Sequence, residues 1–164
     1  MDAIIFDLED AVEVEEKVNA RKLLAETLAA GGYGQRAQIV RLNGMDTEWG
    51  AHDLAAIMEI GPQAVLLPKV ESVEQVAAVA KQLDAHPACA DTQIWAMMET
   101  PRGILHAHAI ATAPRMAGFV MGTNDLAKEL NCRFRPDRLP MQTALQTCLL
   151  AARAAGIVCV DGVY

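Results

Sequence analysis

Charged and amide side chains follow five short apolar runs of the sequence. The segments are "AIIFDLED", "QIVRLNG", "AVLLPKVE", "QIWAMMETP" and "MAGFVM" with "GTND" after it. If the runs are parallel strands, their carboxyl ends lie at one edge of a sheet, where ligands bind in α/β folds. The five endings therefore predict a single site.

Two carboxylates among these endings could bind a metal ion. Glu99 ends "MMETP" and Asp125 stands in "GTND". Two hard oxygen ligands would leave several octahedral positions for water and substrate, as Mg²⁺ prefers. Structural roles explain the same residues, because Asp125 could cap a helix at "LAKEL" and Glu99 could pair with Arg102. The residues alone leave both interpretations open.

Two cationic side chains also stand at predicted strand ends. Arg41 in "VRLNG" could hold a carboxylate or a developing oxyanion in fork geometry, or it could be a structural partner of Glu9 or Glu71. A desolvated Lys69 in "PKVES" could form a Schiff base, but nearby acids favour a protonated amine in a salt bridge with Glu71 or another strand-end acid. The histidines lie in or beside helical patterns, so surface or packing roles are expected for His52, His86, His106 and His108.

Six apolar runs alternate with helical patterns. The runs are short, continuous and rich in Ile, Val, Leu and Met, which is typical of buried parallel strands, and they lie near residues 3–8, 37–42, 64–70, 93–98, 117–121 and 157–160. Helices are predicted at 14–30, 47–60, 72–83, 102–112 and 140–156. Glycines close several of them, and Ser72 and Gln75 have capping-box spacing.

This alternation requires a parallel sheet, either open and doubly wound or closed as a barrel. The first strand ends in "DLEDAV", which would repel the phosphate of a nucleotide, whereas polar groups at many strand ends are typical of a (β/α)8 barrel. A complete barrel takes about 250 residues. We therefore predict an α/β, TIM-type (β/α)8 barrel with about six βα units, the first and last missing, in a single domain over residues 1–164.

Composition restricts the partners. The chain has 164 residues, 52% of them hydrophobic, and a net charge of -7, which argues against nucleic acid and anionic membranes. No apolar stretch approaches the roughly 20 residues of a membrane span, and the four cysteines have no paired spacing. A cytoplasmic protein with reduced thiols and a small metabolite or metal as partner is expected.

Five motifs give the whole chain a family resemblance. They are "DLEDAV", "RLNG", "LLPKVES", "METPRGIL" and "GTNDLAKEL". In this order and spacing they resemble the citrate lyase β-subunit and malyl-coenzyme A lyase family, within the HpcH/HpaI aldolase superfamily. The resemblance implies a (β/α)8 barrel that binds Mg²⁺, or Mn²⁺, and makes or breaks a carbon–carbon bond between an acyl-coenzyme A thioester and a 2-oxo acid. It favours Glu99 and Asp125 as the metal ligands.

The resemblance also assigns the other site residues. Arg41 would stabilise charge on the substrate oxygen, with Glu9 and Asp10 beside it and the metal's water shell, although these two acids could also mark a capped helix start. The remaining substrate contacts would come from the backbone at Gly122, Thr123 and Asn124, where relatives commonly have Glu in place of Asn124. An ordinary strand-to-helix turn is the alternative for Thr123.

The expected reaction is retro-Claisen cleavage of a 3-hydroxyacyl thioester such as citryl- or malyl-coenzyme A, which releases acetyl-coenzyme A and a 2-oxo acid. The alternatives are a class II aldolase acting on a free hydroxy-oxo acid and a truncated, non-catalytic metabolite-binding or assembly subunit. The family's general base would lie beyond Tyr164 and reach the site across a subunit contact. Six strands also leave two open sheet edges, so we expect either a homo-oligomer (a trimer or hexamer) or a chain that is part of a longer polypeptide. Because the base is missing, we expect little turnover by this chain alone.

Overall fold

The computed structural model describes residues 2–163. Its six strands follow one another in the sheet in chain order, β1-β2-β3-β4-β5-β6. The strand order does not reverse, so the topological switch point of a doubly wound sheet is absent from the described strands. The order is the one that successive βα units of a barrel produce, and six strands agree with the number predicted.

The chain divides into two compact units, which are described separately. One contains the residues up to Leu67 together with Lys81–Gln93, and the other contains Pro68–Ala80 and the residues from Ile94 onward. The prediction of a single domain stays a prediction.

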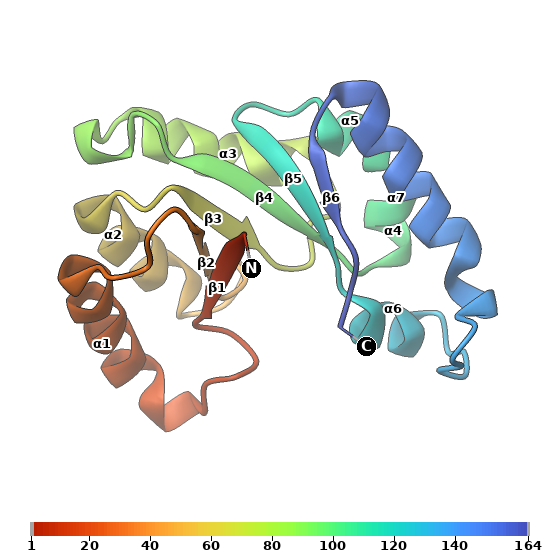
Figure 1. The fold of residues 1–164 in the computed structure, drawn as a ribbon, viewed down its shortest axis with the longest axis horizontal. Helices are drawn as coiled ribbons and strands as arrows, with labels where there is room; N and C mark the ends of the chain where they lie inside the picture. Colours follow the sequence, from red (N-terminus) through yellow and green to blue (C-terminus); the bar gives the residue numbers. More distant parts are fainter. Residues whose placement is uncertain (1, 164) are drawn as a thin grey trace. The chain divides into compact units, whose positions relative to one another are not determined.

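The first unit contains three strands: β1 (Ala3–Asp7), β2 (Ala37–Arg41) and β3 (Ala64–Leu67). They are parallel, and Asp7 of β1 is in register with Arg41 of β2. Between them run the short helix η1 (Val14–Glu16), α1 (Lys17–Ala30) and α2 (Gly50–Ile60), with η2 (Pro87–Cys89) later in the chain. Figure 1 shows α1 and α2 side by side. The predicted strand 64–70 ends early because Pro68 follows β3 and Lys69 adopts a left-handed backbone (φ 49°).

The second unit contains β4 (Gln93–Met98), β5 (Met116–Met121) and β6 (Val158–Val160), of which β4 begins at the last residue of the first unit. The helices are α4 (Pro101–Leu105), α5 (Ala107–Ala111), α6 (Thr123–Glu129), η3 (Leu139–Met141) and α7 (Gln142–Ala155). Helix α3 (Val73–Asp84) begins in this unit and ends in the first. Figure 1 shows α7 beside α5 and β6.

Local signals in the sequence explain most helix boundaries. Helix α7 ends at left-handed Gly156, and α3 follows the predicted capping box, in which Ser72 N–H donates to Gln75 Oε1 (3.1 Å) and Gln75 N–H to Ser72 Oγ (3.4 Å). The single helix predicted at 102–112 is wrong. It is two short helices, because the backbone of His106 (φ -99°, ψ 9°) leaves the helical region between them.

Burial separates the central strands from the edge strands. Every residue of β3 is buried, and so are five of the six in β4, as predicted for parallel strands. In contrast, β1 and β6 lie at the sheet edges, where Ile5, Val158 and Val160 are 41%, 49% and 41% exposed. The prediction of buried strands is therefore wrong for β1 and β6, whereas the prediction of uncovered apolar residues at the edges fits them.

Two further expectations concern helices and thiols. Among residues 2–163, no helix has the length and apolar character needed to cross a bilayer. The cysteines are free thiols, as expected: Cys89 and Cys148 are buried and Cys132 and Cys159 are half-buried.

Candidate functional site

In the first unit, the carboxyl ends of β1 and β2 bring an arginine against three carboxylates. Asp7 and Arg41 are the last residues of the two strands and lie in register. Arg41 Nε donates to Asp7 Oδ1 at 2.7 Å, and Nη2 donates to Asp7 Oδ2, so the pair is bidentate. Nη1 pairs with Glu9 Oε2 at 2.9 Å and with Asp10 Oδ2 at 3.3 Å. We call these four residues the Arg41 cluster.

The interpretation of Arg41 as a structural partner of Glu9 is thus confirmed, and its substrate role stays a prediction. A guanidinium has five N–H groups, and the four carboxylate contacts described leave one for a ligand. Three carboxylates against one guanidinium give the Arg41 cluster a formal charge of -2, which favours a cation or its water shell over a bare anion.

Asp7 determines the electrostatics of the Arg41 cluster. Burial alone would raise its pKa, but the hydrogen bond from Arg41 and those from the amides of Glu9 (2.9 Å) and Ala11 (3.1 Å) outweigh it, so the pKa lies below 3.8. For Arg41, burial would lower the pKa, but the hydrogen bond and charge of Asp7 raise it above its ordinary value. Both groups are therefore charged across the neutral range.

Asp7 was missed from the sequence, although its carboxylate both pairs with Arg41 and organises the loop after β1. Its carboxylate accepts from the loop amides after β1, whereas no side-chain cap on η1 or α1 comes from Asp10. The capped-helix alternative for Asp10 is therefore wrong. Asp7 could have been found because it ends the apolar run "AIIFD", as Arg41 ends its own.

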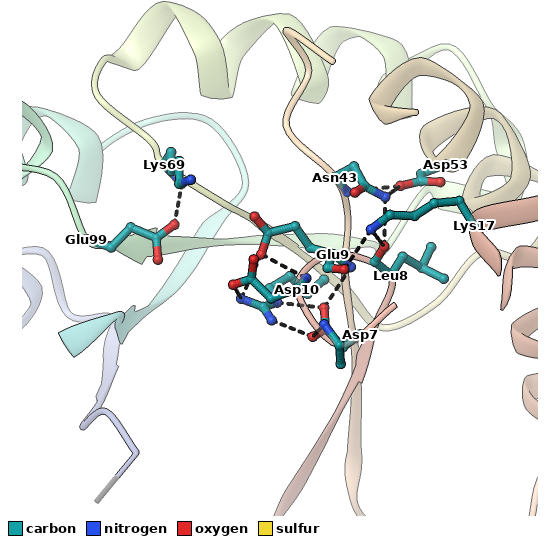
Figure 2. A network of polar contacts seen from close by, with 11 residues as sticks. Asp7, Leu8, Glu9, Asp10, Lys17, Asn43, Asp53, Lys69 and Glu99 are labelled. Atoms are coloured by element: carbon teal, nitrogen blue, oxygen red, sulfur yellow. Dashed lines mark hydrogen bonds and ion pairs between the residues drawn. The ribbon is translucent and has the colours of Figure 1, made fainter. Parts of the chain in front are cut away.

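A buried polar network supports the loop that carries Glu9 and Asp10. Lys17 is 6% exposed, and its Nζ donates to the backbone oxygens of Leu8 (2.8 Å) and Glu9 (2.6 Å). Asn43 Nδ2 also donates to the Leu8 oxygen, at 2.8 Å, and to Asp53 Oδ2, at 2.6 Å (Figure 2). Buried polar groups that are paired in this way fix a loop conformation. Nothing in the local spacing of these residues signals the network.

In the second unit, Glu99 follows β4 and is 3% exposed. Its Oε1 accepts a hydrogen bond from the backbone N–H of Lys69 at 2.8 Å (Figure 2). Gly122 lies against the other side: a Cβ there would collide with Glu99 Oε2 and would stand 2.6 Å from Glu99 Cβ. Glycine is therefore required at 122 because the Glu99 side chain occupies the space of its Cβ.

Lys69 and Glu71 do not form the predicted salt bridge. The Lys69 side chain is exposed, and the ion pair described for Glu71 is with Arg102 Nε, at 3.7 Å. An exposed amine is not desolvated in the way that Schiff-base chemistry requires, so this role of Lys69 is not supported. A salt bridge of Lys69 with another strand-end acid stays a prediction.

Helix α6 carries the remaining predicted residues. Gly122 is its N-cap, and Asp125 stands in its first turn, half-buried and without a capping role, so the N-cap alternative for Asp125 is wrong. Asp125 therefore lies within one helical turn of the residue that touches Glu99. Thr123 is 1% exposed, and its Oγ1 has no hydrogen-bond partner among residues 2–163, whereas Asn124 is exposed.

The residues present fit a magnesium ion better than a softer metal. Carboxylate oxygens are the donors that Mg²⁺ takes, and one or two of them with several waters complete its octahedron. Within residues 2–163, no cluster of three or more His, Cys, Asp or Glu side chains forms a metal site, so a protein cage suited to zinc is absent there. The Glu99 carboxylate fits in its place only because residue 122 is glycine and has no Cβ. This tight fit supports a functional role for Glu99.

A singly wound set of parallel strands with polar groups at their carboxyl ends defines the class of TIM-barrel enzymes. Within this class, the chain belongs to the HpcH/HpaI aldolase/citrate lyase family, whose model matches residues 1–164. The family and the partial TIM-barrel fold predicted from the sequence are confirmed.

Among curated relatives, the chain is 59% identical to a (3S)-malyl-CoA thioesterase of Cereibacter sphaeroides, over 99% of this chain and 55% of that protein. It is 37% identical to the citrate lyase subunit beta of Escherichia coli, over 99% of this chain and 56% of that protein. The chain thus spans about half the length of the curated relatives it matches.

Among solved structures, the chain resembles a citrate lyase beta subunit of Mycobacterium tuberculosis complexed with oxaloacetate and magnesium. The TM-score is 0.82 and the identity 33%, over 99% of this chain and 69% of that one. A second structure, of protein CitE from the same organism, is in complex with magnesium, acetoacetate and coenzyme A, with the same TM-score and identity.

Proposed function

We propose that the protein acts with Mg²⁺ on a 3-hydroxyacyl-coenzyme A thioester of the malyl type. The observation that carries this proposal is the buried Glu99 carboxylate, whose Oε1 accepts from a backbone amide and whose Oε2 lies against Gly122. Gly122 is the N-cap of the helix whose first turn contains Asp125. The likeness to (3S)-malyl-CoA thioesterases and to magnesium-bound citrate lyase beta subunits supports the substrate class and the metal.

In this proposal, Glu99 and Asp125 hold the metal, which would act as a Lewis acid toward the oxygens of the hydroxy or oxo acid. Arg41 contributes its remaining N–H and its positive charge near the substrate oxygen. Glu9 and Asp10 keep Arg41 oriented, and the family resemblance would place them beside the water shell of the ion. The Gly122 N–H donates to the Met98 backbone oxygen (3.2 Å), so the amides of Thr123 and Asn124 are the ones proposed to contact the substrate carboxylate. Whether the Arg41 cluster and Glu99 serve one substrate stays a prediction, because they belong to different units.

Two bonds of such a thioester can break. In hydrolysis, water adds to the thioester carbonyl, the carbon–sulfur bond breaks and malate and coenzyme A are released. In retro-Claisen cleavage, the hydroxyl loses its proton, the bond between the hydroxyl-bearing carbon and the neighbouring CH₂ breaks, and protonation of the enolate yields acetyl-coenzyme A with glyoxylate. The 59% identity to thioesterases favours hydrolysis, and the 37% identity to citrate lyase beta subunits favours carbon–carbon cleavage.

A product assay decides between the two reactions. The purified protein is incubated with malyl-coenzyme A and Mg²⁺, and free thiol, malate, glyoxylate and acetyl-coenzyme A are measured separately, with and without a chelator. Malate with free thiol means hydrolysis, and glyoxylate with acetyl-coenzyme A means lyase activity. Turnover of a free 4-hydroxy-2-oxo acid alone would identify a class II aldolase instead.

The third alternative, a non-catalytic subunit, predicts no turnover in any of these assays although Mg²⁺ and oxaloacetate bind. Light scattering on the same sample tests the predicted homo-oligomer. A stable monomer with full metal-dependent turnover would contradict both the need for self-association and the need for a base from outside this chain.

A further inference from the structure

The turn after β3 adopts a conformation that is uncommon for its residue types. Lys69 has φ 49°, in the left-handed region of the backbone, where residues other than glycine, asparagine and aspartate are rarely found. Its side chain is exposed, whereas its backbone N–H points to Glu99 Oε1. Backbone strain of this kind persists only where the surroundings determine it.

Contacts from α4 and α3 hold the turn, which we define as Lys69, Val70 and Glu71. At Gly103 of α4, a Cβ would collide with the Val70 backbone oxygen, so this glycine lets helix and turn approach closely. His106 Nδ1 lies 2.7 Å from the Glu71 backbone oxygen, and a carbonyl acceptor requires that this nitrogen carries the proton.

The other end of the turn is held by α3, where the Glu71 N–H donates to Gln75 Oε1 at 2.7 Å. The carbonyl and amide of Glu71 are thus engaged by His106, the C-cap of α4, and by Gln75 of α3, and the Val70 oxygen packs against Gly103. Helix α4 begins two residues after Glu99. The segment that carries Glu99 therefore also contacts the 69–71 turn, whose Lys69 N–H binds the Glu99 carboxylate.

We propose that the 69–71 turn is a positioning element for the metal ligand Glu99. The Lys69 N–H holds Oε1 and so fixes the orientation of the carboxylate, whose Oε2 lies against Gly122, the N-cap of the helix that carries Asp125. Lys69 acts through its backbone conformation and not through its amine. This inference rests on the proposed function, because it takes Glu99 as a metal ligand. Partners that orient a metal ligand in this way typically change metal affinity by about 10- to 100-fold.

Matched substitutions at Lys69 separate backbone from side chain. Lys69→Gly removes the amine but tolerates φ 49°, whereas Lys69→Val removes the amine and disfavours this φ because Val is β-branched. We expect calorimetric Mg²⁺ affinity within about 2-fold of the original for Lys69→Gly and about 10-fold weaker for Lys69→Val. A Gly variant as weak as the Val variant, or a Val variant as strong as the original chain, would overturn the proposal.

A metal-free measurement keeps this inference separate from the proposed function. Amide hydrogen exchange reports the Lys69 N–H directly, and we expect it to be protected in the original chain and in Lys69→Gly, and to exchange faster in Glu99→Ala. His106→Ala, which releases one clamp, is expected to accelerate exchange to a smaller extent. Unchanged protection in Glu99→Ala would refute the positioning element. If protection behaves as expected but no variant binds Mg²⁺, the turn orients Glu99 but the proposed metal function fails.

Discussion

The two groups of strand-end residues are held by different means. In the Arg41 cluster, side chains hold side chains: one guanidinium contacts three carboxylates, two of which come from the loop after β1. Around Glu99, the backbone defines the position: a peptide N–H from a left-handed residue binds one oxygen, and a glycine makes room beside the other.

This difference has consequences for substitution. Charges that neutralise one another can rearrange when a ligand competes for them, since long side chains have alternative rotamers. A carboxylate packed between a turn and a glycine has little such freedom. We therefore expect the Glu99 region to respond to small steric changes and the Arg41 cluster to respond to loss of charge.

The largest expected effect is loss of metal binding on removal of a ligand charge. Glu99→Gln and Asp125→Asn should each weaken Mg²⁺ binding by at least about 100-fold, more than loss of an outer partner would. Glu99→Gln can still accept the Lys69 hydrogen bond, so the fold should persist. Calorimetry with Glu129→Gln, an exposed acid of the same helix as Asp125, provides the control. If either variant binds Mg²⁺ as tightly as the control, that ligand assignment is wrong.

One methyl group should be enough to disturb the Glu99 region. Gly122→Ala places a Cβ in the space of the Glu99 side chain, including its Cβ, which cannot rotate away. We expect Mg²⁺ affinity to fall by about 10-fold or more. Gly156→Ala is a useful comparison, because no atom lies within 4 Å of a Cβ there, although its left-handed φ makes alanine slightly destabilising. Equal metal affinity in the two variants would show that the packing against Glu99 is not required.

Loss of charge at Asp7 should destabilise the first unit. Asp7→Asn removes a bidentate partner of Arg41, and we expect the free energy of unfolding to fall by about 2 kcal/mol. The matched variant Asp10→Asn removes a carboxylate that is 63% exposed and should cost less than about 1 kcal/mol. Denaturant titration at pH 7 measures both. Equal costs would mean that burial does not distinguish these two ion pairs.

Exchange of Arg41 tests its proposed role toward substrate. Arg41→Lys keeps the charge but loses the fork geometry, so binding of oxaloacetate, glyoxylate or pyruvate should weaken by about 1–3 kcal/mol. Arg41→Lys also weakens the contact with Asp7. Asp7→Asn serves as the control, because it removes the same contact but leaves the Arg41 guanidinium in place. If affinity for all three acids is unchanged in Arg41→Lys, the residue has only the structural role seen in the Arg41 cluster.

The smallest expected effect is a pH dependence. The pKa of Asp7 in the folded chain lies below 3.8, so the stability it contributes is complete above that value and is lost as pH falls through the lowered pKa. The stability difference between the original chain and Asp7→Asn should be constant from pH 7 to about pH 5 and shrink below about pH 4. A difference that is constant down to pH 3 would contradict the lowered pKa.

The sequence by itself determined the repeated βα units and the chemical types of the site residues. Continuous apolar runs predicted β2 at 37–42, found at Ala37–Arg41, and Ser72 with Gln75 predicted the start of α3, because strand burial and helix capping depend on neighbours only a few residues apart. The same runs placed Arg41, Glu99 and Asp125 at strand ends or just after them.

Only the tertiary structure decided which of these groups meet. Asp7 pairs with Arg41 across 34 positions of sequence, and Lys69 donates to Glu99 across 30. The first contact depends on strand register and the second on a left-handed backbone that apolar patterning does not encode; the same patterning extended β3 too far, to residue 70. Long-range pairing is determined by the register and packing of whole elements, so it cannot be inferred from local spacing.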